Sequence, residues 1–313
     1  MAGEGAGSEG EWTRQHWIMP RQRAGTFGIR ARPWLLLAPS LVFLLAFTYW
    51  PLVQVLEGSF RDQAFGSAAS WGIGNYARLF ADPHFGRAAW NNVLYAAGTI
   101  VPSVILALGF ALALRETTLF TTAARMLVVL PLLIPLVAAA ALFTFVFLPG
   151  EGLLDWYLGP LGLQAVNWLG SPSLALGAVS AITVWKNTGY YMLFFLAGLA
   201  GVSQDLLDAA RIDGARAVAR FRHVTLPMLG PTFGFVLPIA LVNALVQVDQ
   251  VVTVTQGGPS DSTNLLLYYI YQQAEQNHDA GLAAAATVIS VAALLVLTVA
   301  SLCTMERGIH YES

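Results

Sequence analysis

The sequence predicts an all-α membrane protein with six transmembrane helices. Three observations predict this fold class. Hydrophobic residues make up 56% of the 313-residue chain and charged residues only 11%, whereas a soluble domain carries roughly 25% charged residues. Six apolar stretches reach the length of about 20 residues that a helix needs to cross the hydrocarbon core. The basic residues collect in alternate connections between those stretches.

The expected spans are residues 34–56, 88–114, 124–148, 173–200, 232–255 and 280–303. Four of them contain proline, which removes a backbone donor and bends a helix. Buried bundle helices tolerate this because neighbouring helices satisfy the freed groups. The first span is too long for a secretory signal and lacks a small-residue cleavage site, so it is expected to remain as a helix. The membrane domain is therefore expected at 34–303, between tails at 1–33 and 304–313.

The basic residues predict the orientation of the spans. They are fifteen arginines and one lysine, Lys186. Twelve arginines lie in the two tails and in the connections after the second and fourth spans, while Arg61, Arg78 and Arg87 lie in the first connection. Because basic residues favour the cytoplasmic side, both termini are predicted to be cytoplasmic. The net charge of −2 and the single cysteine argue against a nucleic-acid partner and against a disulfide framework or cysteine metal cluster.

Motifs that carry catalysis are missing from the sequence. It has no G-x-x-x-x-G-K-[ST] phosphate loop, no H-E-x-x-H pair, no G-x-S-x-G elbow, and its five histidines are scattered. We therefore expect a non-enzymatic chain that binds no cofactor or metal and acts in transport, signalling or scaffolding. An ion-gradient-driven secondary transporter is an alternative, but it would favour intramembrane carboxylates and inverted repeats. Asp249 is the only carboxylate well inside an expected span, and no repeat is evident.

The most informative connection joins the fourth and fifth spans, at residues 203–227, and is called the coupling loop below. Ser203 is a good N-cap for a short helix that Gly214 can end or bend. A second short helix, 215–223, carries Arg216 and Arg220 one turn apart, and Pro227 closes the unit. A connector does not need two helices and four arginines. A cationic loop that rests on anionic lipid remains an alternative.

This loop resembles the "EAA" loop of the permease subunits of bacterial ABC importers. The matching residues are Asp208-Ala209-Ala210, Asp213-Gly214-Ala215 and Leu226-Pro227, with Asp208 where the family usually has Glu. The carbohydrate-uptake branch of the family, which includes permeases for maltose, other sugars and glycerol 3-phosphate, is similar in four further motifs: Val184-Trp185-Lys186, Leu196-Ala197-Gly198-Leu199, Thr255-Gln256-Gly257-Gly258-Pro259 and Gly74-Asn75-Tyr76. Residues 266–271 and 306–311 look nearest to the glycerol-3-phosphate permease A type. The resemblance covers about residues 33–311.

The resemblance implies a type I ABC importer permease fold in the bacterial inner membrane. It also implies a second permease subunit, two ATP-binding subunits that hold ATP and Mg²⁺ and dock at the coupling loop, and an extracytoplasmic binding protein that delivers the substrate. The residues that would couple ATP hydrolysis to transport are Asp208, Ala209, Ala210, Asp213, Gly214, Arg216 and Pro227. Asp208 either receives a basic residue of the ATPase or caps its own helix.

Polar residues inside the spans predict a substrate path. Asn243, Gln247 and Gln250 are spaced i, i+4, i+7 and would share one helical face, the amide stripe. The fourth span adds Lys186, Asn187 and Tyr190. Amides and tyrosine rings suit a polyhydroxylated ligand such as a sugar, a polyol or glycerol 3-phosphate. Two alternatives stay open: amides that hydrogen-bond between helices, and a lysine that pairs with a carboxylate or backbone carbonyls or extends to the membrane surface. The site can also lie in the second permease.

Overall fold

The computed structural model describes residues 36–62, 70–162 and 165–306. The tail expected at 1–33 lies outside these residues, as does 307–313, while the last helix continues to Glu306. The chain divides into two compact units, 1–53 and 54–313. Within the first unit, residues 36–53 are helical and include the π-helical turn η1 (Leu45–Tyr49). The side chains of this helix are largely exposed and apolar, as expected of a helix that faces lipid or another subunit.

The second unit is almost entirely helical. Among its described residues there is one strand pair, which is antiparallel, with Arg61 of β1 (Arg61–Asp62) opposite Trp71 of β2 (Ser70–Trp71). In chain order the helical segments are α2 (Trp50–Ser59), α3 (Gly74–Ala81), α4 (Pro83–Ala113), α5 (Leu119–Val129), η2 (Leu130–Leu133), α6 (Leu136–Val146), α7 (Leu153–Leu158), η3 (Gly159–Leu161), α8 (Ala175–Ala200), α9 (Gln204–Ile212), α10 (Ala217–Arg220), η4 (Phe221–Thr225), α11 (Leu226–Met228), α12 (Gly230–Val246), η5 (Val251–Thr255), α13 (Leu266–Tyr271), η6 (Gln272–Gln276) and α14 (Ala280–Glu306).

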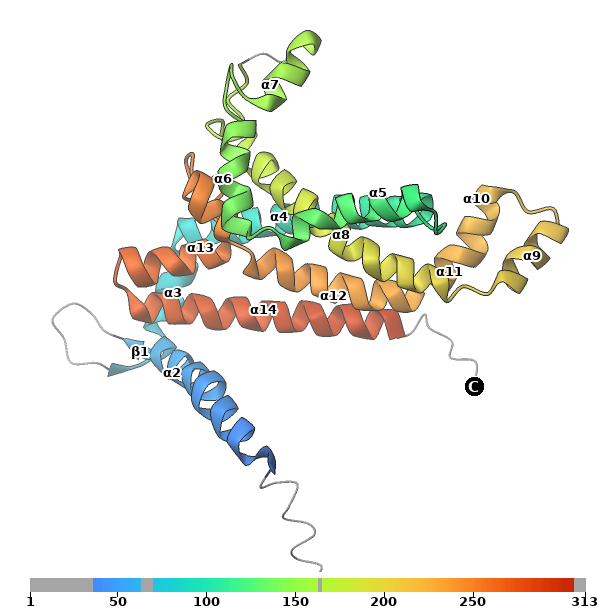
Figure 1. Ribbon diagram of the computed structural model, residues 1–313. Coiled ribbons are helices and arrows are strands. Elements are labelled where there is room, and N and C mark those ends of the chain that lie inside the picture. Colours follow the sequence, from blue (N-terminus) through green and yellow to red (C-terminus); the bar gives the residue numbers. More distant parts are fainter. Residues whose placement is uncertain (1–35, 63–69, 163–164, 307–313) are drawn as a thin grey trace, which may run out of the picture. The chain divides into compact units, whose positions relative to one another are not determined.

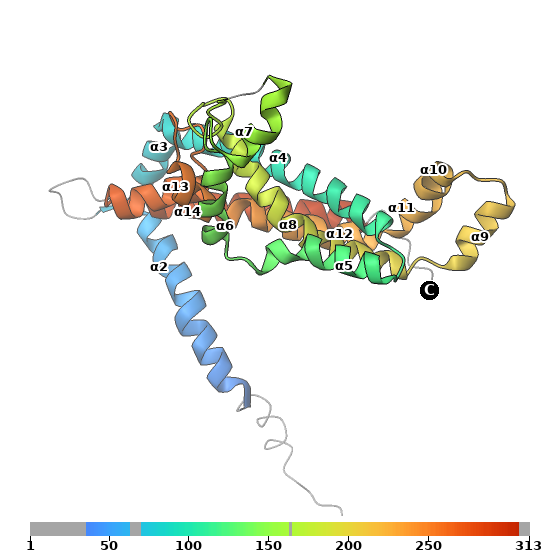
Figure 2. The same cartoon turned by 45° about the horizontal axis from the view of Figure 1, so that its top comes forward.

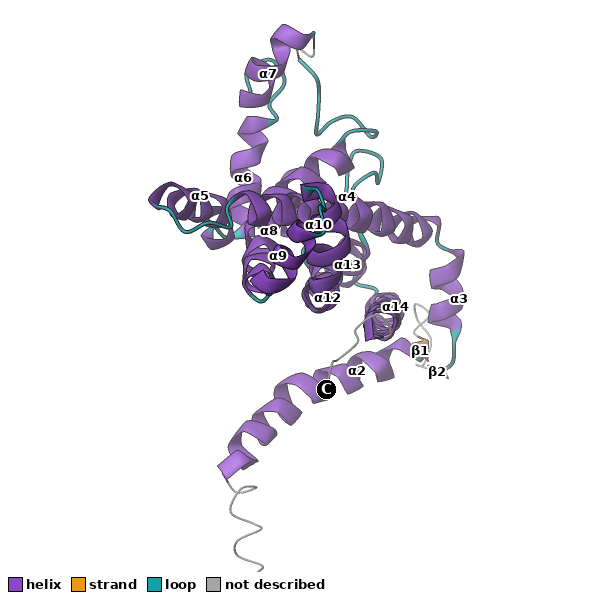
Figure 3. Ribbon diagram, turned by 90° about the vertical axis from the view of Figure 1, so that its right-hand side faces the viewer, coloured by secondary structure: helices purple, strands orange, loops and turns teal. Residues whose placement is uncertain are grey.

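Four long helices form the body of this unit. Helix α4 packs against α8 and α12, and α12 packs against α14 (Figure 1). The short helices α9 and α10 lie at one end of this bundle, and α3 and α13 lie at the other (Figures 1 and 2). A view along the bundle shows α12 and α14 nearly end-on (Figure 3). The largest part of the core joins α4, α8 and α12 through buried side chains such as Tyr191, Phe195 and Val236.

The described helices agree with the expected spans in position, with two breaks. Four helices are long and apolar enough to cross a membrane: Leu36–Ser59, Pro83–Ala113, Gly230–Thr255 and Ala280–Cys303. Two bent pairs raise the number to six if each is counted as one span: Leu119–Leu133 with Leu136–Val146, and Ala175–Ala200 with Gln204–Ile212. The angles between the partners are 103° and 70°. The third expected span is therefore sharply bent.

The fifth expected span is interrupted at Gln247 and Val248. Helix α12 ends at Val246, and Gln247 adopts an extended backbone with φ −79° and ψ 102°. Side chains donate to backbone carbonyls where the helical hydrogen bonds are interrupted. Asn92 Nδ2 donates to the Ala244 carbonyl at 3.5 Å, and Gln250 Nε2 donates to the Gln247 carbonyl at 2.9 Å. Inserted side chains are a recognised cause of such breaks. The expectation that the amide stripe shares one continuous helical face is therefore wrong.

Candidate functional site

The coupling loop contains a short helix with a well-formed end. Helix α9 starts after Ser203, whose hydroxyl makes no capping bond, although its position is the predicted one. At the other end Gly214 has φ +76°, and the Ala215 amide donates to the Ala210 carbonyl at 2.9 Å. This left-handed ending favours glycine. A Cβ added at Gly214 would meet nothing within 4 Å, so the backbone angle, and not lack of space, sets the need for glycine.

The charged residues of the coupling loop pair locally. Asp208 Oδ1 accepts hydrogen bonds from Arg211 at 2.7 Å and from Gln204 at 3.3 Å. Arg220 donates to the Ala215 carbonyl at 2.9 Å, which ties the second short helix to the end of the first. That helix, expected at 215–223, consists of α10 and the π-helical turn η4. Asp208 makes these contacts from inside α9, whose caps are Ser203 and Asp213, so the carboxylate does not cap its own helix in this structure.

The other predicted coupling residues frame these two helices. Ala209 and Ala210 lie within α9, and Asp213 is its C-cap. Arg216 occupies the N-cap position of α10, and Pro227 lies in the first turn of α11.

Sequence reasoning missed the exposed apolar residues of the coupling loop. Ile212 and Val218 are 88% and 77% exposed, whereas Leu207 is buried. Helix α9 therefore packs within the loop, against α10 and η4, with Leu207 buried, while Ile212 on α9 and Val218 on α10 are exposed. Exposed apolar side chains indicate a docking surface where they form a contiguous patch. Their signal in the sequence is their place in the motif: Ile212 directly precedes Asp213, and Val218 follows Arg216 by two residues.

A hydrogen-bonded network joins α4, α8 and the broken fifth span inside the bundle. Tyr95 Oη lies 2.6 Å from Thr183 Oγ1 and 2.5 Å from Gln250 Nε2. Gln250 is completely buried. Its Nε2 donors are used by the Tyr95 hydroxyl and the Gln247 carbonyl. The predicted path residue Gln250 thus serves the bundle interior in this structure.

The other predicted amides meet across α8 and α12. Asn187 Nδ2 donates to Gln247 Oε1 at 3.1 Å, and Asn243 Nδ2 donates to the Tyr191 hydroxyl at 3.1 Å. Tyr190 is half-buried and packs edge-on against Phe194, with 5.0 Å between ring centroids. The structure therefore brings Asn187, Asn243 and Gln247 together at the break in the fifth span.

The contacts of Lys186 lie away from these amides. Its Nζ donates to the carbonyls of Pro131, Leu132 and Ile134, at the bend of the third span. Backbone carbonyls were one of the alternatives that the sequence left open, and they are the partners found here.

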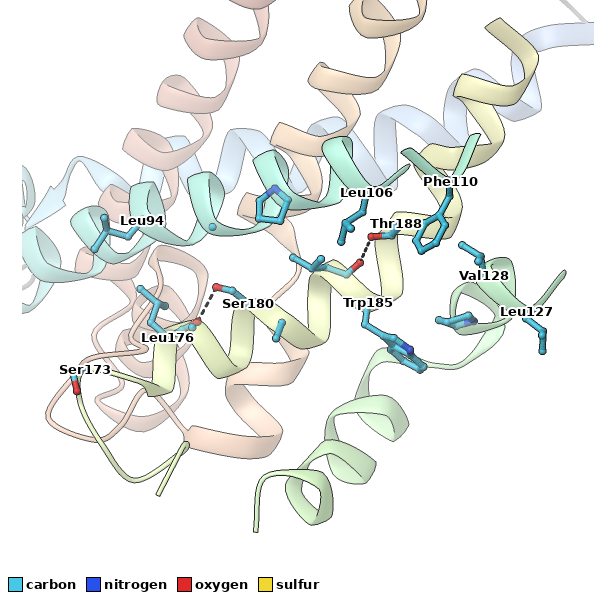
Figure 4. Close-up of a pocket in the computed structure, with 16 residues that line it drawn as sticks. Leu94, Leu106, Phe110, Leu127, Val128, Ser173, Leu176, Ser180, Trp185 and Thr188 are labelled. Carbon is cyan, nitrogen blue, oxygen red and sulfur yellow. Dashed lines mark hydrogen bonds between the residues drawn. The ribbon is translucent and has the colours of Figure 1, made fainter. Parts of the chain in front are cut away.

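A large groove lies beside this bend. It has a volume of about 860 Å³ and lies between α4, α8 and the α5–η2 segment (Figure 4). Leu94, Leu106 and Trp185 are among its lining residues. The hydroxyls of Ser180 and Thr188 also face it, but each donates to a carbonyl of its own helix, at 2.7 and 2.6 Å. None of the predicted path residues lines this groove, and its apolar wall does not suit a polyhydroxylated ligand.

The end of the bundle near α3 and α13 is cross-linked by polar contacts that sequence reasoning missed. Tyr269 Oη donates to Asp82 at 2.6 Å, His84 Nδ1 lies 2.6 Å from Asp261, and Arg78 pairs with Asp279. Burial raises the pKa of the Tyr269 phenol, and the neighbouring Asp82 carboxylate acts in the same direction. The phenol therefore remains a donor at neutral pH.

Two of the resembling motifs have structural explanations at this end. Asn75 Nδ2 donates to the carbonyls of Ser59 and Arg61 at 3.2 and 2.9 Å, which ties α3 to the strand pair. Gly257 has φ +79°, and a Cβ there would lie 2.6 Å from the Tyr268 ring. Both the backbone angle and the ring therefore require glycine. Within the described ranges, no three His, Cys, Asp or Glu side chains gather as a metal site would need.

Long apolar helices, amides between them and a projecting two-helix loop define a multi-pass membrane transport protein. The chain belongs to the family of binding-protein-dependent transport system inner membrane components. Residues 103–307 of the chain match the sequence pattern of this family. The predicted resemblance to the permease subunits of carbohydrate-type ABC importers is thereby confirmed. In this family the permease is the membrane component of the transporter.

Curated relatives cover nearly the whole chain. The sn-glycerol-3-phosphate transport system permease protein UgpA of Salmonella typhimurium is 31% identical over 289 residues, which is 91% of this chain and 98% of that protein. UgpA of Brucella abortus is 32% identical over 290 residues, 92% of this chain and 99% of that protein.

Solved structures show the same fold. One is a bacterial ABC transporter involved in the import of the acidic polysaccharide alginate, with a TM-score of 0.78, 24% identity, and coverage of 90% of this chain and 98% of that one. The same type of transporter in complex with an alginate pentasaccharide-bound periplasmic protein gives a TM-score of 0.76 at 23% identity, with coverage of 88% and 95%. The type I ABC permease fold expected from the sequence is thus supported.

Proposed function

We propose that this chain is the six-span permease subunit of an ATP-driven importer for a sugar, a polyol or glycerol 3-phosphate. Both termini face the cytoplasm, and the protein lies in the bacterial inner membrane. The observation that carries the proposal is the coupling loop, where α9 ends at Gly214 and projects Ile212 into solvent. The relatives that are named as glycerol-3-phosphate permeases favour that substrate class.

The coupling loop receives the ATPase. Ile212 and Val218 supply an apolar docking surface. The Asp208–Arg211 pair stiffens helix α9. ATP and Mg²⁺ reside on the ATP-binding subunits, one of which binds this chain and the other a second permease. Only Gly201, Val202 and Ser203 separate α8 from α9, and Val202 is buried. A displacement of α9 by the ATPase is therefore transmitted to α8, whose amide Asn187 contacts the break in the fifth span.

The substrate path uses the amides at that break. Asn187, Asn243 and Gln247, with the ring of Tyr190, offer donors, acceptors and an apolar platform to hydroxyl groups. Lys186 is not carried into this path because its contacts lie at the bend of the third span, away from these amides. Gln250 is left out because its side chain is completely buried. An extracytoplasmic binding protein delivers the substrate to the end of the bundle near α3 and α13.

Reconstitution tests the proposal. The complete complex is placed in proteoliposomes, with its binding protein outside and ATP inside. It is expected to take up labelled glycerol 3-phosphate or maltose only when the binding protein and ATP are both present. Ile212→Asp should abolish uptake while Ile212→Val retains it, because only the first places a charge in the apolar docking surface. Uptake driven by a proton or sodium gradient without ATP would instead identify a secondary transporter.

A further inference from the structure

We propose that Lys186 is a positioning residue that fixes the bend of the third span by donating to the carbonyls that the bend exposes. The inference concerns the arrangement of α5 and α6, which no comparison assigns. Its structural part does not depend on the proposed function. The transport measurement given below does rest on that function.

The bend follows from two prolines. Pro131 lies in the 3₁₀ turn η2, and Pro135 directly precedes α6. Residues before proline are pushed toward extended conformations, and Ile134 has φ −83° and ψ 127°. The helix cannot continue through this residue, so α6 leaves at 103° to the helix before it. Figure 1 shows α6 running off the direction of α5.

A bend of this kind exposes backbone carbonyls inside a span. Pro135 has no N–H to donate, and the extended backbone at Ile134 separates the remaining carbonyls from donors in the next turn. Unsatisfied backbone groups are costly in the hydrocarbon region, where water cannot replace the missing partner. The end of a helix also carries partial negative charge, which favours a cation there.

Lys186 supplies what the bend lacks. Its ammonium group has three N–H donors, and it contacts three carbonyls: Pro131 at 3.4 Å, Leu132 at 3.3 Å, and Ile134 in the closest contact. The side chain is buried. The Pro131 carbonyl also accepts from the Ile134 N–H at 3.2 Å, so the lysine adds a contact there and is the donor found for the Leu132 and Ile134 carbonyls.

The neighbouring residues of α8 contact both halves of the bent span. At Gly189, one turn beyond Lys186, a Cβ would lie 2.1 Å from the Val128 carbonyl, so glycine lets α5 approach closely. Trp185 packs edge-on against Phe143 of α6, with 5.2 Å between ring centroids. Three neighbouring residues of α8 thus contact the bent span: Trp185 contacts α6, Lys186 contacts the bend, and Gly189 lies against α5. The lysine supplies the polar contacts of this packing surface. Its position next to tryptophan is therefore explained by the bend and does not require contact with substrate.

Distance measurements in the whole complex test the inference. Spin labels at Leu127→Cys and Phe145→Cys, which are 71% and 72% exposed, would report the α5–α6 geometry in a Cys303→Ser background with cysteine-free partner subunits. We expect one narrow distance for the parent chain. Lys186→Met keeps the length of the side chain, removes the three donors and should broaden or shift the distribution. Lys186→Arg should restore it.

A second-site variant keeps the test decisive. Pro135→Ala returns an N–H to the bend, so it should partly reverse the effect of Lys186→Met. Thr188→Val is the matched control on the same helix, because its hydroxyl serves only the Val184 carbonyl among the described contacts, and it should leave the distances unchanged. If Lys186→Met assembles with unaltered α5–α6 distances, the positioning role is wrong.

Uptake kinetics separate positioning from substrate contact. In the positioning role, Lys186→Met lowers the maximal uptake rate on the order of tenfold, with little change in KM, and Pro135→Ala recovers part of the loss. A raised KM with unchanged spin-label distances would overturn the inference in favour of substrate contact. Failure of the parent complex to transport would count against the proposed function alone, because the distance measurement stands without it.

Discussion

Tyr95 Oη and Gln250 Nε2 lie 2.5 Å apart at the centre of the helix bundle. The contact joins α4 to the short segment that follows the break in the fifth span. The same hydroxyl lies 2.6 Å from Thr183 of α8, so one phenol links three elements. The break is therefore held by side chains from outside its own helix, and this arrangement gives several measurable consequences.

Tyr95→Phe should destabilise the protein without changing its shape. The substitution removes the hydroxyl and leaves the Gln250 amide and the Thr183 hydroxyl without that partner, which typically costs about 1–3 kcal/mol. Thermal denaturation of the purified complex in detergent measures the loss. Tyr157→Phe, on an exposed ring, is the control and should leave the transition unchanged. An unaltered transition for Tyr95→Phe would mean that the network adds nothing to stability.

Asn243→Ala and Gln247→Ala should each raise the KM for uptake while membrane levels stay the same. The reason is the loss of an amide that faces hydroxyl groups of the substrate in the proposed path. Tyr191→Phe is the informative comparison, because it removes the partner of Asn243 and keeps the amide. If Tyr191→Phe reproduces the Asn243→Ala kinetics, the amide acts between helices and does not contact the substrate.

Gly214→Val should uncouple ATP hydrolysis from transport. A β-branched residue at φ +76° costs on the order of 1–2 kcal/mol of backbone strain, which is relieved by unwinding the end of α9. Gly214→Asn should retain most of the activity because asparagine tolerates the left-handed region. The ratio of ATP hydrolysed to substrate transported, measured in proteoliposomes, is the readout. If Gly214→Val and Gly214→Asn both keep the parent's ratio of ATP hydrolysed to substrate transported, this backbone angle has no role in coupling.

Asp208→Ala distinguishes the two roles that the sequence left open for this carboxylate. Its pairing with Arg211 is exposed, and such pairs contribute roughly 0.2–1 kcal/mol. A purely local role therefore predicts near-normal stability and transport, and Arg211→Ala should behave alike. A large fall in affinity for the ATPase, seen for Asp208→Ala but not for Arg211→Ala, would show that the carboxylate also binds the partner.

Much of the architecture could be predicted from the sequence because apolar length and glycine position are local properties. The sixth expected span, 280–303, agrees with Ala280–Cys303, and Gly214 ends α9 in the conformation that glycine favours. Prolines were expected to bend four spans: Pro131 and Pro135 do so in the third, whereas Pro102 and Pro238 lie inside the uninterrupted helices α4 and α12. These features depend on residues close together in the chain.

The break in the fifth span could not be predicted in the same way. Gln247 and Val248 lie beside no glycine or proline, and the break is accompanied by hydrogen bonds from Asn92 and Gln250. One of these residues lies more than 150 positions earlier in the chain. The target of Lys186 was equally hidden, because its carbonyl partners belong to another helix. Such contacts arise only from tertiary structure.

The bend of the third span also has an evolutionary consequence. Proline at position 135 creates the need for a donor, and lysine at position 186 meets it, so neither residue is advantageous without the other. In homologous permeases we expect the two positions to covary: chains with an ordinary residue at 135 are free to lose the lysine, and chains that keep the proline retain a cation. A lineage can exchange a bent span for a straight one only by changing both.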